Sequence, residues 1–88
     1  MKIVRIGAMW CPSCIMVNKY WNDVKNEFSN IEFIDLDLDL DEEESLLLNP
    51  GKILPVFIFF KDDIEVRRII GEKKKDEMYN LIKDVFSL

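Results

Sequence analysis

The chain has 88 residues, of which 49% are hydrophobic, and it carries a formal net charge of −5. This length allows one compact domain with one core and is too short for two. The acidic balance gives no electrostatic support to a nucleic-acid partner, and no segment approaches the roughly 18 consecutive apolar residues of a membrane span. We therefore expect one soluble domain, residues 1–88, that binds neither nucleic acid nor membrane.

The first two predicted elements are a strand and a helix. A short, β-branched, apolar segment from Ile3 to Gly7 predicts the strand. A loop then leads into Pro12, which suits the first position of a helix because proline has no N–H to satisfy. Beyond it, apolar residues recur on one helical face, and Ser29-Asn30 supplies a stop signal. The face consists of Val17, Tyr20, Trp21, Val24 and Phe28. The helix is expected from about residue 12 to about residue 28.

The only two cysteines of the chain lie where this strand gives way to this helix, in the pentapeptide Trp10-Cys11-Pro12-Ser13-Cys14. Two thiols separated by two residues can close a small disulfide within the first turn of a helix. The unpaired N–H groups and the positive dipole end at that point favour a thiolate. The pattern predicts a redox centre in which Cys11 is the nucleophile and Cys14 its resolving partner.

Other roles for the cysteine pair stay open. Zinc usually takes four protein ligands, and the chain has no histidine and no second cysteine pair, so a metal site would need a second subunit. Inert thiols are the other alternative. No secretory signal is visible between Met1 and Ile6, and a lone cysteine pair suits a reducing cytoplasm, where disulfides are mostly transient and catalytic. We expect a cytoplasmic protein.

A second strand and a second helix are predicted next. The segment from Ile31 to Asp39 ends in alternating apolar and acidic residues, which predicts a strand with one buried face. A right-handed crossover would make it parallel to the first strand. Acidic residues 41–44 before Leu46–Leu48 predict a short helix that Asn49-Pro50-Gly51 would end. We interpret the acidic stretch 35–44 as solvated surface.

The last three predicted elements are two strands and a helix. The apolar run Val56–Phe60 behind Pro55 is typical of a central strand covered on both faces. Asp62-Asp63 marks a turn into an edge strand from Ile64 to Ile70, paired as a hairpin. Gly71 breaks the chain before a helix that carries Met78, Leu81, Ile82 and Val85. The predicted fold class is α/β, in the order β-α-β-α-β-β-α.

This element order, with a Trp-Cys-x-x-Cys motif after the first strand and a proline just before the third, resembles the thioredoxin superfamily in its minimal form. The resemblance covers essentially the whole chain and implies a four-stranded mixed sheet flanked by helices. It implies a cis peptide bond at Leu54-Pro55 beside the cysteines, and Gly71 matches the family's glycine after the fourth strand. By resemblance, a substrate polypeptide would lie against Trp10, Pro12, the Leu54-Pro55 segment and Gly71, main chain to main chain.

The resemblance implies a thiol-disulfide oxidoreductase that reduces protein disulfides and needs no cofactor. The thiolate of Cys11 would attack a substrate disulfide, and Cys14 would then attack Cys11 and release the reduced substrate. Its partners would be disulfide-containing proteins and an upstream thiol reductase or a low-molecular-weight thiol, and we expect a monomer. Proteins with this fold and motif spacing span about 150 mV in reduction potential, so the direction of electron flow stays open.

The chain departs from the family in two places. Arg5 stands six positions before Cys11, where thioredoxins commonly carry a buried aspartate, and the second strand offers no lysine. The usual proton acceptor for Cys14 is missing, and water or a nearby carboxylate would have to replace it. Pro12-Ser13 between the cysteines looks more like glutaredoxins, although the segment 70–73 lacks the paired glycines that hold glutathione there.

Three alternative functions follow from these departures. One is a non-catalytic binding module on a thioredoxin fold. Another is a glutathione-linked, glutaredoxin-like protein. The third is a dimer that bridges an iron-sulfur cluster through Cys11.

Overall fold

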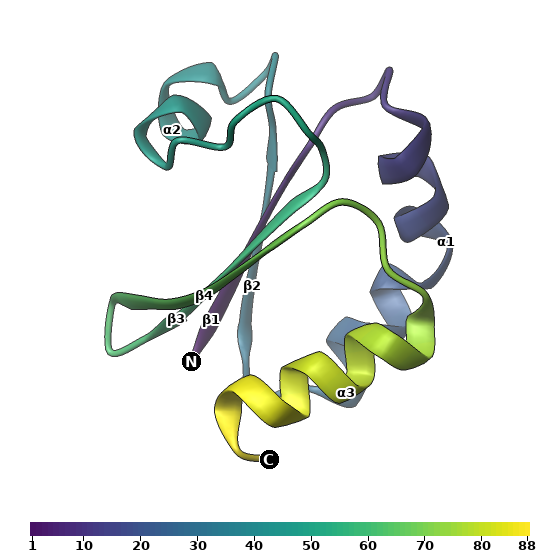
Figure 1. Ribbon diagram of the computed structural model, residues 1–88, viewed down its shortest axis with the longest axis vertical. Coiled ribbons are helices and arrows are strands. Elements are labelled where there is room, and N and C mark those ends of the chain that lie inside the picture. The colour runs from purple at the N-terminus through teal and green to yellow at the C-terminus, as the bar shows by residue number, and fades with distance from the viewer.

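Four strands form one mixed sheet in the order β2-β1-β3-β4 (Figure 1), in a computed structural model that describes residues 1–88. The central strands are β1 (Lys2–Gly7) and β3 (Val56–Lys61), and the edge strands are β2 (Glu32–Asp37) and β4 (Ile64–Ile70). β1 runs parallel to β2 and antiparallel to β3, which is antiparallel to β4. The predicted fold class, strand orientations and element order are confirmed.

Three helices cover the sheet. α1 (Pro12–Glu27) and α3 (Lys75–Phe86) lie beside each other on one face, and α2 (Glu42–Leu47) lies near the end where β1 passes into α1 (Figure 1). Since α1 begins at Pro12 and ends one residue before Phe28, the predicted bounds of the first helix are nearly correct. None of the three helices is long and apolar enough to cross a membrane.

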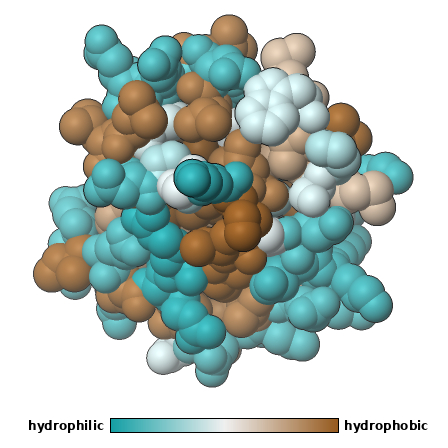
Figure 2. All heavy atoms as spheres, turned by 45° about the horizontal axis from the view of Figure 1, so that its top comes forward, coloured by the Kyte–Doolittle hydropathy of each residue, from teal (hydrophilic) through white to brown (hydrophobic).

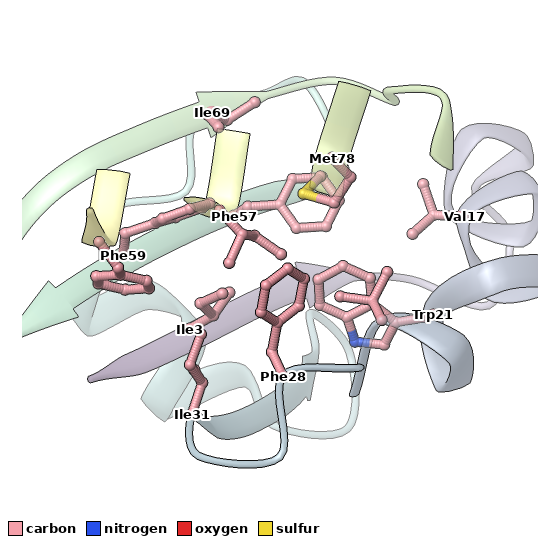
Figure 3. Packing of buried hydrophobic residues seen from close by; sticks show 12 residues of the cluster. Ile3, Val17, Trp21, Phe28, Ile31, Phe57, Phe59, Ile69 and Met78 are labelled. Carbon is pink, nitrogen blue, oxygen red and sulfur yellow. The ribbon is translucent and has the colours of Figure 1, made fainter. Parts of the chain in front are cut away.

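The main core lies between the sheet and the helices α1 and α3. Phe57 and Phe59 of β3 point to this side and are fully buried, while Val56 and Ile58 point to the other side and are buried as well. Trp21 of α1 packs with its ring centroid 5.2 Å from that of Phe57 (Figure 3). Burying each such side chain contributes about 1.5–3 kcal/mol, so the apolar run of β3 holds both layers together.

The second strand is shorter than predicted, because β2 ends at Asp37 and not at Asp39. The carboxylate of Asp37 accepts hydrogen bonds from the backbone N–H groups of Asp39, at 2.9 Å, and Leu40, at 3.1 Å. The carboxylate of Asp41 accepts the N–H of Asp37 at 2.9 Å. Aspartate side chains thus bind the backbone N–H groups of this turn, which in a longer strand would pair with a neighbouring strand. The prediction from alternation that the strand continues to Asp39 is therefore wrong.

Two turns after β3 need backbone conformations that the sequence supplies. Asp62 and Asp63 have φ values of 53° and 64°, the pattern of a two-residue hairpin turn whose twist matches that of the strands. Gly71 follows β4 with a φ of 89°, a region that favours glycine. The predicted hairpin and the predicted break before α3 are both present.

Candidate active site

The two cysteines lie together at the N-terminus of α1. Cys11 is the N-cap residue with extended backbone, and Pro12 occupies the first turn. The backbone N–H of Cys14 donates a hydrogen bond to the Cys11 sulfur at 3.3 Å. Both thiols are free and about 95% buried, with exposures of 5% and 4%. This is the geometry in which a helix N-terminus stabilises a thiolate on the capping residue.

The Cys14 thiol holds its proton tightly. Burial and the adjacent Cys11 raise the pKa of this thiol from 9.0 to about 11, although a hydrogen bond with the backbone of Ala8 and, to a smaller extent, the charge of Arg5 act to lower it. A thiol with this pKa keeps its proton at neutral pH. The role of Cys11, the helix-capping residue, as the nucleophile stays a prediction.

Trp10 is exposed beside Cys11 but fixed in orientation. Its side chain is 64% exposed, and its indole Nε1–H donates a hydrogen bond to a carboxylate oxygen of Asp39 at 2.7 Å. The acidic pattern of residues 35–44 indicates only solvated surface, so the sequence carries no signal for this role of Asp39. Trp10 and Asp39 are far apart in the sequence, and the turn after β2 brings them together.

The Leu54-Pro55 peptide bond is cis, as the resemblance implies. Leu54 packs in the same apolar cluster as Cys11 and Cys14, and Pro55 is fully buried. The carbonyl oxygen of Pro55 accepts the N–H of Gly71 at 2.8 Å. This hydrogen bond joins the segment before β3 to the glycine after β4. The segment before β3 also packs with the cysteines, through Leu54.

The surface around this end of the sheet is largely apolar. Figure 2 turns the top of Figure 1 forward and shows brown hydrophobic surface interrupted by polar side chains. The loops there expose Met9, Leu40 and Ile53 by 78%, 77% and 63%. No three or more histidine, cysteine, aspartate or glutamate side chains gather anywhere as a metal-binding group.

Comparisons with known proteins agree with this geometry. The family profile described as Thioredoxin matches residues 1–84. Thioredoxin H4 of Arabidopsis thaliana is 29% identical over 82 residues, covering 92% of this chain and 68% of that protein. Thioredoxin of Oryctolagus cuniculus is 30% identical over 73 residues, with coverages of 83% and 69%. The solved structure of Fasciola hepatica thioredoxin superposes with a TM-score of 0.82 at 26% identity, covering 93% of this chain and 78% of that one.

Proposed function

Since the chain belongs to the thioredoxin family and is a thiol-disulfide oxidoreductase, we propose that Cys11 and Cys14 are its redox-active pair and that it reduces disulfides of protein substrates. The single observation behind this assignment is the hydrogen bond of 3.3 Å from the N–H of Cys14 to the sulfur of Cys11. That bond holds both thiols in the first turn of α1, where one can attack the other.

The proposed cycle has two exchange steps. In the first, the Cys11 thiolate attacks one sulfur of a substrate disulfide, and the other substrate sulfur leaves as a thiolate. In the second, Cys14 loses its proton and attacks the Cys11 sulfur. The Cys11–Cys14 bond forms, the bond from Cys11 to the substrate breaks, and the substrate leaves reduced by two electrons. An upstream thiol reductase or a low-molecular-weight thiol then reopens the Cys11–Cys14 disulfide.

We propose that substrates bind across Trp10, Pro12, Leu54, Pro55 and Gly71. Trp10 and Pro12 flank Cys11 in the sequence, and both are exposed. A Cβ built on Gly71 would meet nothing within 4 Å, so this glycine leaves open space beside the segment it binds. An extended peptide that pairs with backbone here would present its disulfide to Cys11 without a requirement for particular side chains.

The cellular compartment and the oligomeric state of the protein are part of the same proposal. A reducing compartment such as the cytoplasm would keep the catalytic disulfide transient. We propose a monomer in that compartment, with disulfide-containing proteins as substrates.

Trapping the mixed disulfide tests the assignment of roles. Cys14→Ser should accumulate a species in which Cys11 is covalently linked to a substrate protein, visible by mass and reversed by added dithiol. Cys11→Ser is the matched control and should trap none. Equal trapping by both variants, or by neither, would refute the proposed roles. A reversible two-electron transition of the wild type in graded thiol-disulfide buffers should lie at a strongly reducing potential.

Colour separates the iron-sulfur alternative from this proposal. Protein purified without oxygen should show no visible absorbance if Cys11 is a redox thiol and not a cluster ligand. A transition at a markedly more oxidising potential would favour isomerase or glutathione-linked exchange over disulfide reduction.

A further inference from the structure

A pocket of about 190 Å³, lined by both charged and apolar residues, opens beside the resolving cysteine, Cys14. It runs between the end of β1, the first turns of α1 and the turn after β2, and Gly7 and Cys14 form part of its wall. A Cβ on Gly7 would lie 3.1 Å from the Cys14 sulfur, so the absence of a side chain at residue 7 leaves room for this sulfur in the pocket wall. A water molecule occupies about 30 Å³ of liquid, so the pocket can hold several.

One cation lines this pocket, the guanidinium of Arg5 from β1. Its Nη1 donates to the side-chain oxygen of Asn18 at 2.6 Å, and its Nε donates to a carboxylate oxygen of Asp35 at 3.2 Å. The guanidinium carbon lies 5.2 Å from the ring centroid of Trp21, and the side chain is only 15% exposed. These contacts hold the guanidinium of Arg5 in one position, so its charge is fixed beside the pocket.

The positive charge of Arg5 is not cancelled by its carboxylate partner. Asp35 accepts hydrogen bonds from both Arg5 and the ammonium group of Lys25, and a third from the indole N–H of Trp21. Two cations thus share this one anion, so Arg5 is only partly neutralised by Asp35, although Asp37 and Asp41 bring further negative charge to the same pocket. This matters next to a buried thiol, because a nearby opposite charge favours the ionised form.

Two more carboxylates line the pocket, and both are engaged by backbone. Asp37 accepts N–H groups of the turn after β2, and Asp41, the N-cap of α2, accepts the N–H of Asp37. The ionisable groups that line the pocket with Cys14 are therefore Arg5 from β1, Asp35 and Asp37 from β2, and Asp41.

We propose that Arg5 promotes the second exchange step, by stabilising the Cys14 thiolate electrostatically while the pocket carries the released proton to solvent. This inference rests on the proposed function. Arg5 stands at the position where thioredoxins commonly carry a buried aspartate. In this chain a fixed positive charge at that position helps to ionise the resolving thiol. The backbone of Ala8 and, to a smaller extent, the charge of Arg5 lower the pKa of Cys14 against the opposing effects of burial and of Cys11.

The step balances with the groups named. In the mixed disulfide, the Cys14 thiol gives its proton to water in the pocket, and the resulting thiolate attacks the Cys11 sulfur. A Cys14–Cys11 bond forms and the bond from Cys11 to the substrate sulfur breaks. The substrate sulfur leaves with the electron pair and becomes a thiol on protonation. Arg5 touches neither reacting sulfur, so it is a positioning residue and not a catalytic one.

The pKa of Cys14 can be measured without turnover. In a Cys11→Ser background, the carbon-13 shift of the Cys14 Cβ would be followed by NMR against pH. Arg5→Met removes the charge and keeps an unbranched side chain at this position, and it should raise the Cys14 pKa by about one unit. Arg5→Lys should restore much of the shift. Lys19→Met removes an exposed charge from α1 outside the pocket and should leave the pKa unchanged.

Asp35→Asn distinguishes electrostatics from loss of structure. It removes the anion beside Arg5 and should lower the Cys14 pKa, the opposite of the Arg5→Met effect. If Asp35 were instead the proton acceptor, Asp35→Asn would slow the second step at unchanged or higher Cys14 pKa. That result, or no shift in Arg5→Met protein that remains folded by circular dichroism, would overturn the inference.

The rate of the second step provides an independent readout. In a chain with both cysteines, an aromatic disulfide reagent releases one coloured thiolate at each exchange, so the second absorbance phase, whose rate does not depend on reagent concentration, reports attack by Cys14. A tenfold smaller thiolate fraction, partly offset by the greater nucleophilicity of a more basic thiol, predicts a phase about threefold slower in Arg5→Met near neutral pH. An unchanged rate would contradict the proposal. Failure of Cys14→Ser to trap substrates would instead refute the proposed function, whatever the pKa.

Discussion

Gly7 leaves room for the Cys14 side chain at the junction of β1 and α1: a Cβ on Gly7 would lie 3.1 Å from the Cys14 sulfur and 3.5 Å from its Cβ. Gly7→Ala should therefore displace the resolving thiol and destabilise the fold by about 1–3 kcal/mol through overpacking. The second absorbance phase with an aromatic disulfide should slow as well. Chemical denaturation and stopped-flow absorbance measure the two effects.

Gly51→Ala is the control for this substitution. Gly51 has a φ of 79° but nothing within 4 Å of a built Cβ, so alanine there strains the backbone without touching the cysteines. It should lose stability and keep the normal second phase. A Gly7→Ala protein with wild-type exchange kinetics would show that the sulfur adjusts freely, and would contradict the importance of this contact.

The sequence predicts those parts of the site that depend on local signals. The spacing of Cys11 and Cys14 and the proline between them fix a helix start, and the structure has the N-cap there. The contacts of Gly7 with Cys14 and of Trp10 with Asp39 could not be predicted in this way. They join residues from different elements, and only the packing of β1, α1 and the turn after β2 decides which side chains meet.

The fold shows the same division between local and distant effects. The apolar run of β3 and its central place in the sheet follow from composition, because a strand covered on both faces has no polar side. The end of β2 does not, because aspartates at 37 and 41 bind backbone N–H groups and stop the strand where alternation would continue it. Short polar side chains that bind backbone override a period-two pattern.

Asp39→Ala should release Trp10 from its fixed orientation. The bond from the indole Nε1–H to Asp39 measures 2.7 Å, and loss of an exposed hydrogen bond of this kind costs about 1 kcal/mol, or about fivefold in the KM for a protein disulfide. The indole cross-peak of Trp10 in a nitrogen-15 NMR spectrum should shift and exchange faster with solvent. The reduction potential should not change. Glu43→Ala, which removes an exposed charge from α2, should alter none of these quantities.

Arg68→Met should loosen the segment before the cis proline. From β4, Arg68 donates hydrogen bonds to the backbone carbonyls of Asn49, at 2.7 Å, and Leu48, at 2.8 Å, where α2 ends. Hydrogen bonds from a charged donor to these otherwise free carbonyls predict a loss of about 1–3 kcal/mol in the free energy of unfolding. Hydrogen exchange should increase most in the segment 46–54.

Glu65→Gln isolates the ion pair in the same network. Glu65 pairs with Arg68 at 2.9 Å, but the two side chains are 39% and 24% exposed, so this substitution should cost less than about 1 kcal/mol. If Glu65→Gln proved as costly as Arg68→Met, the ion pair and not the carbonyl bonds would be the main contribution of Arg68.

Ser45→Ala should stabilise the protein. Ser45 is fully buried in α2, and its hydroxyl oxygen has no hydrogen-bond partner. Alanine removes this unsatisfied group and favours the helix, which together predict a gain of about 1 kcal/mol in the free energy of unfolding. Thermal and denaturant unfolding measure it. A loss of stability would indicate that the hydroxyl binds a backbone carbonyl one turn earlier.

The reduced protein should become less stable in alkali because of Cys14. Burial raises the pKa of this thiol from 9.0 to about 11. A group that holds its proton more tightly when folded stabilises the fold fully below its unfolded pKa, and this contribution is lost as pH rises through the folded pKa. Denaturant unfolding of the reduced wild type should therefore show stability falling across the range from pH 9 to about 11.

Cys14→Ala and the oxidised wild type both lack this titrating thiol, and their stabilities should depend less on pH over the same range. Burial also raises the pKa of Tyr20, to about 12, and the nearby Asp23 raises that of Lys75, but both groups stay in all three proteins. The difference between the curves of the reduced wild type and of Cys14→Ala therefore isolates Cys14. Parallel curves for reduced wild type and Cys14→Ala would show that the resolving thiol has the same pKa folded and unfolded, which would remove the reason for it to need the charge of Arg5.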